Sequence, residues 1–281
     1  MKIAIQGGKA SFHEMVARQR YAEYSELILL ECRTFSEVCN KLKTHEAEGA
    51  VMAIENSLVG AILPNYSLLE KHSFKIVGEN YLHIRQNLMA LPGQRLEQIE
   101  TVISHPMALH QCSDFLEANP QLQVEESHDT ADSAKRIRTE NLVGWAAIAS
   151  ELAAELYNLN IVKASVENRE SNYTRFLGLS RDSLENSECN KASINFRVNH
   201  STGALANVLD IFRDFKVNLS LIQSIPIPEQ SNQYAFHVDL EWSDKSDYID
   251  AISKVSELTS KLKILGEYKA GKKPNSRNGL N

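Results

Sequence analysis

The sequence predicts an α/β fold of two lobes, followed by a smaller domain with the ferredoxin-like βαββαβ order. Strand-like and helix-like segments alternate through residues 1–180, which favours sheets covered by helices on both faces. From residue 192 onward, apolar and polar residues alternate in several short runs, which is typical of strands with one buried face. Residues 181–191, between these regions, are polar and aperiodic, and they predict a linker.

The first lobe is predicted from three strand patterns and two helix patterns. The strands lie at residues 2–6, 27–30 and 50–54, and the helices at residues 11–21 and from residue 34 onward. Thr34 and Glu37 form a capping-box pattern at the start of the second helix. The run at residues 50–54 is continuously apolar, as expected of a buried parallel strand.

The second lobe repeats this alternation. Strands are predicted at residues 102–103 and 122–124, helices at residues 105–116 and 129–138, and a strand that runs into a helix at residues 142–156. A further strand at residues 173–179 is the candidate to return to the first lobe. These two α/β units of comparable size predict two lobes around a cleft.

The last region supplies the βαββαβ order. Strands are predicted at residues 192–198, 217–221, 234–240 and 264–268, and helices at residues 205–212 and 249–262. The strand at residues 192–198 is predicted to be half-buried, because Ala192 and Ile194 alternate with Ser193 and Asn195. Residues 270–281 predict a disordered tail.

Composition argues against several classes of protein. The 281 residues carry a formal net charge of −6 and no basic block, so nucleic acid is not expected as the main partner. No apolar run approaches the roughly 18–20 residues of a membrane span, and the N-terminus lacks the features of a signal peptide. The four cysteines are widely spaced without a Cys-x-x-Cys pair, so we expect the cytoplasm and no zinc site.

Two polar motifs follow predicted strands, at the strand ends where α/β sheets bind ligands. The motif Glu55-Asn56-Ser57 comes after the buried strand of the first lobe and supplies hydrogen-bond donors. Its alternative role is a polar turn that caps the next helix. The loop from Gly7 to Ser11 can hold a carboxylate with backbone N–H groups, or it can be a plain tight turn.

Three further motifs lie at the starts of helices or strands. His105, in Ser104-His105-Pro106, is a candidate acid or base, with helix capping as the alternative. The pair Asp129-Thr130 has the composition of a helix cap. In the run Asn172-Tyr173-Thr174-Arg175-Phe176, the guanidinium can pair with a carboxylate, while the threonine and the phenylalanine also suit a strand and a core.

Taken together, these segments resemble the prephenate dehydratase family over nearly the whole chain. The matching motifs occur in the order of the family. They are Gly7 with Ser11-Phe12; Ile54-Glu55-Asn56-Ser57; Ser104-His105-Pro106 with Ala108-Leu109 and Gln111-Cys112; Thr130 with Ala131 and Ala134; Ala146-Ala147-Ile148-Ala149-Ser150; and Asn172 with Thr174-Arg175-Phe176.

The resemblance implies two α/β lobes like those of type 2 periplasmic binding proteins, with the active site in the cleft. It implies conversion of prephenate to phenylpyruvate, CO2 and water, without cofactor or metal. Thr174 matches the threonine considered essential in the family, and Glu55 is expected to organise its loop. The implied substrate-binding residues are Ser11, Asn56, Ser57, Thr130, Arg175 and Phe176.

The second region contains the motifs Gly203-Ala204-Leu205 and Val217-Asn218-Leu219, and with them it resembles an ACT-type domain. This resemblance implies feedback inhibition by L-phenylalanine and assembly into a dimer or a tetramer. The implied effector-binding residues are Gly203, Ala204, Leu205, Asn218, Leu219 and Ser224. The sequence departs from the family here, because Gln223 and Ile225 stand where the family has a glutamate and an arginine, and Thr202 replaces a proline. The loop at residues 7–13 departs as well, since it lacks the family's proline and second glycine.

Two other functions stay open at the level of sequence. An arogenate dehydratase would share the fold and the chemistry, with an amino acid side chain in place of the keto acid. A non-catalytic amino-acid-binding sensor is the alternative from another class. We expect a monofunctional chain, because no additional mutase or dehydrogenase domain fits into 281 residues.

Overall fold

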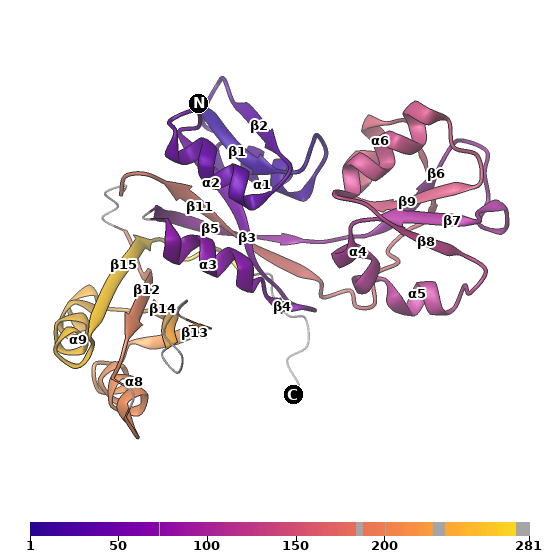
Figure 1. Cartoon of the computed structure of the whole chain (residues 1–281). Coiled ribbons are helices and arrows are strands. Elements are labelled where there is room, and N and C mark those ends of the chain that lie inside the picture. The colour runs from indigo at the N-terminus through magenta and orange to yellow at the C-terminus, as the bar shows by residue number, and fades with distance from the viewer. Residues whose placement is uncertain (73, 184–187, 200, 227–233, 274–281) are drawn as a thin grey trace. The chain divides into compact units, whose positions relative to one another are not determined.

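A computed structural model of the chain describes residues 1–72, 74–183, 188–199, 201–226 and 234–273 (Figure 1). The chain divides into two compact units. Unit 1 comprises Met1–Gly60, Tyr81–Phe176 and Lys273–Asn281, and unit 2 comprises Ala61–Asn80 and Leu177–Lys272. Residues 274–281 of the tail predicted at residues 270–281, and residues 184–187 of the predicted linker, lie outside the described residues.

The first sheet has the strand order β2-β1-β3-β11-β5, with β4 paired to β3. Its strands are β1 (Lys2–Gln6), β2 (Ile28–Cys32), β3 (Gly49–Asn56), β4 (Gly60–Ala61), β5 (Lys75–His83) and β11 (Tyr173–Ser180); the helices between them are α1 (Phe12–Arg20), α2 (Phe35–Lys43) and α3 (Leu63–Lys71). Strand β1 is parallel to β2 and β3. The strand predicted at residues 173–179 therefore does return to the first sheet, beside β3.

The second sheet has the order β10-β6-β9-β7-β8. Its strands are β6 (Asn87–Ala90), β7 (Thr101–Ser104), β8 (Gln123–Glu126), β9 (Trp145–Ala149) and β10 (Asn160–Lys163); its helices are the 3-10 turn η1 (Leu96–Gln98), α4 (Pro106–Gln111), α5 (Ser113–Glu117), α6 (Thr130–Glu140) and α7 (Glu151–Leu156). Met89 and Ala147 pack toward α6 and α7, whereas Leu88 and Ala146 pack toward α4. The prediction of helices on both faces is confirmed for this sheet (Figure 1).

Two features of this region differ from the predictions. The helix predicted at residues 105–116 is two helices, α4 and α5, because the backbone of buried Cys112 leaves the helical conformation at φ −114° and ψ 20°. Strands β6 and β10 of this sheet, and strands β4 and β5 of the first sheet, were not predicted. Strands β6 and β10 have four residues each, too few for a clear period, and β5 mixes charged with apolar residues.

The third sheet is antiparallel and has the order β13-β14-β12-β15. The elements are β12 (Lys191–Arg197), α8 (Ala204–Asp214), β13 (Asn218–Pro226), β14 (Tyr234–Glu241), α9 (Lys245–Leu258) and β15 (Lys261–Tyr268). The predicted βαββαβ order is confirmed. The predicted end of the second helix was wrong: Leu262 belongs to β15, because Thr259 already has an extended backbone at φ −109° and ψ 138°. Strand β13 also extends to Pro226, beyond the predicted residues 217–221.

Strand β12 is more buried than its alternating pattern predicted. Ala192, Ile194 and Phe196 pack against Val208 and Phe212 of α8 in the hydrophobic core of this sheet. The opposite face is buried as well, since Ser193 is 0% exposed and Lys191 only 1% exposed. The residues that cover this polar face belong to α3 and β5, which are distant in sequence.

The described residues contain no helix that combines the length and the apolar character needed to cross a bilayer. All four cysteines are buried and free of disulfide bonds. Cys39 is 1% exposed, and Cys112, which is 0% exposed, packs in a hydrophobic core cluster of the second sheet.

Candidate functional site

Hydrogen bonds join the carboxyl end of β3 to the start of β11. The backbone N–H of Ser57 donates to the carbonyl of Tyr173 at 2.8 Å. The Ser57 hydroxyl accepts from the Tyr173 N–H at 2.9 Å and donates to the carbonyl of Ser171 at 2.8 Å. Ser57 thus bonds the backbone of Ser171 and Tyr173, the residues on either side of Asn172, and Tyr173 directly precedes Thr174.

Asn56 connects these two strands through its side chain. Its Nδ2 donates to Asn172 Oδ1 at 2.8 Å and to Thr174 Oγ1 at 2.9 Å. Its Oδ1 accepts the backbone N–H groups of Leu58 and Val59 at 2.9 and 3.3 Å, which fixes the orientation of the amide. Because the Thr174 oxygen accepts from Asn56, the proton of its hydroxyl is directed elsewhere and can be donated.

Two glutamine side chains extend this network. Asn172 Nδ2 and Gln86 Nε2 both donate to Gln111 Oε1, each at 3.1 Å. Gln86, Gln111 and Asn172 are at most 4% exposed. The sequence motifs contained Gln111 and Asn172 without a role, and no local pattern pointed to Gln86, since only the fold brings it to Gln111.

The loop after β1 is tied to its surroundings through backbone groups. Ser11 is the N-cap of α1, where its hydroxyl accepts the N–H of Glu14 at 3.2 Å. The carbonyl of Ala10 accepts the Ser150 hydroxyl at 2.8 Å. Ala10, which stands where the family pattern has its second glycine, has a φ of 67°, in the left-handed region that favours glycine.

The same loop contacts the start of α6. Asp129 is the N-cap of α6, and its Oδ1 accepts the N–H groups of Ala131 and Asp132 at 2.8 and 3.0 Å. The backbone N–H of Gly8 also bonds this carboxylate. Burial raises the pKa of Asp129 to about 6, against an ordinary value of 3.8, although these hydrogen bonds oppose the shift. Thr130, the next residue, is the first residue of α6 and is 8% exposed.

Replacing Gly7 with alanine should destabilise this contact. Gly7 has a φ of +92°, and a Cβ there would lie 2.5 Å from Asp129 Oδ2. The left-handed backbone costs about 1–2 kcal/mol with a side chain present, so with the clash we expect a loss of at least about 2 kcal/mol. Urea denaturation measures this loss in the free energy of unfolding. The control is Gly93→Ala, at a φ of +87° with no atom within 4 Å of the Cβ; an equal loss in both variants would contradict the clash.

The raised pKa of Asp129 predicts how stability depends on pH. The folded protein holds this proton more tightly than the unfolded chain, with a pKa of about 6 against 3.8. The resulting stabilisation, about 3 kcal/mol, is fully present below pH 3.8 and is lost as the pH rises through about 6.

Asp129→Asn should therefore flatten the fall in unfolding free energy between about pH 4 and pH 6, measured by urea denaturation in a series of buffers. Asp244→Asn is the control, because Asp244 is an exposed N-cap whose pKa is lowered by its bonds to Ser246. A fall that persists in Asp129→Asn would show that other groups cause it.

A histidine packs against Phe176, which lies two residues beyond Thr174 on β11. The ring of His13 meets Phe176 edge-on with centroids 5.0 Å apart, and it packs on Phe35 at 5.3 Å. Burial lowers the pKa of His13 to about 3, and the nearby His105 adds to the effect, so the imidazole is neutral. His105 itself caps α4, because its Nδ1 accepts the N–H of Met107 at 3.1 Å, as in the capping alternative.

The structure thus brings only some of the predicted site residues into direct contact. Asn56, Ser57 and Thr174 share hydrogen bonds with the run that begins at Ser171. Ser11 lies at the N-terminus of α1 and Thr130 at the N-terminus of α6. The loop before α1 is joined to the cap of α6 by the bond from the Gly8 N–H to the Asp129 carboxylate. Glu55 is half-buried in β3 and Arg175 is 3% exposed; their roles stay predictions.

The residues predicted to bind L-phenylalanine all lie in unit 2. Gly203 has a φ of +83° and precedes α8, which starts with Ala204 and Leu205. Asn218, Leu219 and Ser224 lie on β13. Among the departures from the family in this region, Gln223 donates to the carbonyl of Ser224 at 2.9 Å, and Ile225 is buried at 4% exposure. Across the described residues, no three His, Cys, Asp or Glu side chains group as metal ligands would.

Comparison with known proteins gives a consistent result. The family model described as prephenate dehydratase matches residues 3–184. The arogenate dehydratase/prephenate dehydratase 2 of Arabidopsis thaliana is 34% identical over 280 residues, which cover 95% of this chain and 72% of that protein.

Two solved structures are similar over nearly the whole chain. The prephenate dehydratase from Arthrobacter aurescens in complex with L-Phe has a TM-score of 0.84 and 25% identity, covering 96% of this chain and 90% of that one. The protein GqqA, described as a novel type of quorum quenching acylase, has a TM-score of 0.83 and 28% identity, covering 96% of this chain and 98% of that one.

Proposed function

Because the chain belongs to the prephenate dehydratase family, we propose that it converts prephenate to phenylpyruvate with loss of CO2 and water, in the biosynthesis of L-phenylalanine. The observation that carries the proposal is the hydrogen bond from Asn56 Nδ2 to Thr174 Oγ1 at 2.9 Å, inside a buried amide network. This contact joins the two most informative motifs of the chain, which are 118 residues apart.

Thr174 is proposed to donate its hydroxyl proton toward the ring hydroxyl that leaves prephenate. Asn56 donates to a lone pair of Thr174 Oγ1, so the O–H of Thr174 points away from Asn56 and can donate to another acceptor. The orientation of Asn56 is fixed by Asn172 and the backbone of Leu58. A hydroxyl group held in this way needs no reorganisation when the C–O bond breaks.

The reaction itself explains why a weak acid suffices. Loss of CO2 and water makes the ring aromatic, so the overall change is strongly downhill. A threonine hydroxyl is too weak an acid to protonate the leaving group before C–O cleavage. Transfer during or after cleavage fits better, and the protein mainly holds geometry and assists departure.

The two carboxylates of prephenate need positive partners, which the predicted binding residues can supply. Ser11 and Thr130 lie at the N-termini of helices of 9 and 11 residues, where the helix dipole favours negative charge. Arg175 supplies a guanidinium suited to bidentate pairing, and Ser57 and Phe176 complete the proposed set. Glu55 is proposed to organise its loop without contacting the substrate.

A release assay for phenylpyruvate tests the proposal. The purified protein, offered prephenate without added metal or cofactor, should form phenylpyruvate, and kcat/KM on prephenate should exceed that on arogenate. A higher kcat/KM on arogenate would reassign the substrate. No turnover of either compound, with binding of the compound intact, would favour the sensor alternative.

L-phenylalanine is proposed as a feedback inhibitor that binds near the start of α8 and on β13. The proposal rests on the predicted residues at Gly203–Leu205 and on the βαββαβ order of this sheet. Calorimetry should show binding of L-phenylalanine, and initial rates should fall when it is added. An absence of binding heat together with unchanged initial rates would contradict the proposal that L-phenylalanine is an inhibitor.

Self-association and a cytoplasmic location complete the proposal. Strand β13 ends the strand order of its sheet, so it offers an edge for pairing with a second copy, as a dimer or within a tetramer. Light scattering after size-exclusion chromatography measures the mass, and a monomer at assay concentration would contradict this part. Four buried free cysteines suit a reducing compartment.

A further inference from the structure

One stretch of chain, residues 57–83, leaves the candidate site and returns to it; we name it the α3–β5 segment. At its first end, Ser57 bonds the backbone N–H and C=O of Tyr173. At its last end, the ring of His83 stacks on Tyr173 with centroids 4.7 Å apart, and the next residue, Ile84, donates its N–H to the carbonyl of Asn172 at 2.8 Å. Both ends therefore bear on the two residues that precede Thr174.

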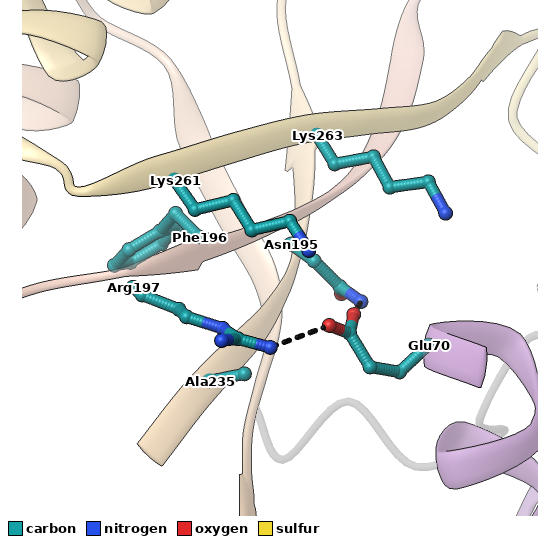
Figure 2. Close-up of a pocket in the computed structure, with 7 residues that line it drawn as sticks. All are labelled: Glu70, Asn195, Phe196, Arg197, Ala235, Lys261 and Lys263. Carbon is teal, nitrogen blue, oxygen red and sulfur yellow. Dashed lines mark hydrogen bonds and ion pairs between the residues drawn. The ribbon is translucent and has the colours of Figure 1, made fainter. Parts of the chain in front are cut away.

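The middle of the α3–β5 segment, residues 61–80, belongs to unit 2, where it binds the polar face of the four-stranded sheet. Glu79 forms an ion pair with Lys191 at 3.0 Å, and both side chains are 1% exposed. Glu70 forms a second pair with Arg197 at 3.1 Å and accepts from Asn195 at 2.6 Å (Figure 2). All three partners, Lys191, Asn195 and Arg197, lie on β12.

Further contacts tie the same segment to β14 and β15. Tyr66 packs edge-on against the ring of buried His237 with centroids 4.9 Å apart. Lys75 Nζ donates to the carbonyl of Ile264 at 3.2 Å. A Cβ on Gly266 would lie 2.0 Å from the carbonyl oxygen of Ile76, so β5 and β15 approach as closely as their backbones allow. The segment is thus fixed to three strands of this sheet.

Strand β12 connects the segment to the elements proposed to bind the effector. Lys191, Asn195 and Arg197 contact the α3–β5 segment, whereas Ile194 and Phe196 between them pack in the core with α8. Closely packed cores shift between discrete arrangements instead of deforming gradually. A shift in the position of α8 against β12 would therefore displace β12 and, with it, the α3–β5 segment.

We infer that the α3–β5 segment carries regulation from the four-stranded sheet to the Asn56–Thr174 network. The inference rests on the proposed inhibition by L-phenylalanine. Binding near Gly203 shifts β12, the ion pairs of Glu70 and Glu79 transmit the shift, and the ends of the segment at Ser57 and His83 move Tyr173 and its neighbours. Inhibition then acts on the geometry around Thr174, not on direct competition for the site.

Glu70→Gln tests this inference, because it weakens one link of the segment without touching the site. The measured quantity is the coupling factor, the ratio of kcat/KM without and with saturating L-phenylalanine. We expect the coupling factor to fall at least about fivefold, since allosteric coupling is typically about 5–150-fold. The kcat/KM without effector should stay within about twofold, and calorimetry should still show L-phenylalanine bound.

A second variant and a control separate coupling from general weakening. Arg197→Gln should lower the coupling factor as Glu70→Gln does, and the double variant should lose no more than either single one, because the two residues form one link. Glu257→Gln, which removes an exposed carboxylate paired with Lys254 on α9, should leave the coupling factor unchanged.

Each outcome decides a different question. If the wild-type protein is inhibited and Glu70→Gln is inhibited equally while it binds L-phenylalanine, the inference is wrong and the dehydratase function stands. If the wild-type protein turns over prephenate but is not inhibited, the inference is also wrong, again without loss of the dehydratase function. If the wild-type protein has no turnover, the proposed function fails and the inference falls with it.

Discussion

Thr174→Val should lower kcat for phenylpyruvate formation by at least about 100-fold while leaving the fold intact, since a positioned proton donor contributes about 10²–10⁴-fold. Valine keeps the shape of threonine and removes only the hydroxyl. KM for prephenate should change much less than kcat, because the hydroxyl is proposed to act on the leaving group in the transition state. Steady-state kinetics with matched circular dichroism spectra measure both effects.

The control for this substitution is Thr139→Val, which makes the same chemical change on the exposed face of α6, where the hydroxyl bonds only backbone carbonyls. Its kinetics should match the wild-type protein. Near wild-type turnover in Thr174→Val would remove Thr174 from the proposed mechanism. A loss confined to KM would assign Thr174 to substrate binding instead of chemistry.

Lys191→Met should give the largest loss of stability, about 3–5 kcal/mol, because it leaves the buried carboxylate of Glu79 without its ammonium partner. Lys191 lies 3.0 Å from Glu79, which is 1% exposed, and 3.1 Å from the more exposed Glu241. Methionine has nearly the same length and volume, so the change isolates the charge. The free energy of unfolding from urea denaturation measures the effect.

The double variant Lys191→Met, Glu79→Gln should recover at least about half of that loss, since it removes the buried negative charge as well. Lys254→Met is the control, because Lys254 pairs with Glu257 on the surface of α9, where both side chains are more than half exposed; such pairs contribute at most about 1 kcal/mol. Equal losses in Lys191→Met and Lys254→Met would mean that burial does not govern the Lys191 pair.

The two predictions concern different parts of the molecule. Thr174 lies in unit 1 and Lys191 in unit 2. Stability and catalysis can therefore be impaired separately, by one substitution each. The Glu79–Lys191 pair also links the α3–β5 segment to β12, but breaking it is expected to destabilise the protein. Glu70→Gln removes a more exposed pair and is therefore the better variant for testing regulation.

Much of the fold was predictable from the sequence because it depends on local patterns. The apolar run at β3 and the alternation at β12 and β14 predicted strands where the structure has them. A capping pattern marked the start of α2 at Thr34, and Ser11, predicted as the first residue of a helix, is the N-cap of α1. Short strands such as β6 and β10 escaped, because four residues do not establish a period.

The candidate site was predictable only as a set of ordered motifs. Taken alone, Thr174 is an ordinary strand residue and Asn56 an ordinary turn residue. Their hydrogen bond spans 118 positions of the sequence, and no local pattern contains it. Gln86 shows the same limit more sharply, since it belongs to no motif and joins the network only through its contact with Gln111.

The sequence by itself determined the α/β order, the βαββαβ region and the ordered motifs that place the chain in its family, because periodicity and residue type act over a few positions. Tertiary structure alone decided what covers the polar face of β12. Alternation predicted a face open to water, whereas α3 and β5 bury it through Glu70 and Glu79. The Glu79–Lys191 pair joins residues 112 positions apart, and only the folded chain brings these charges together.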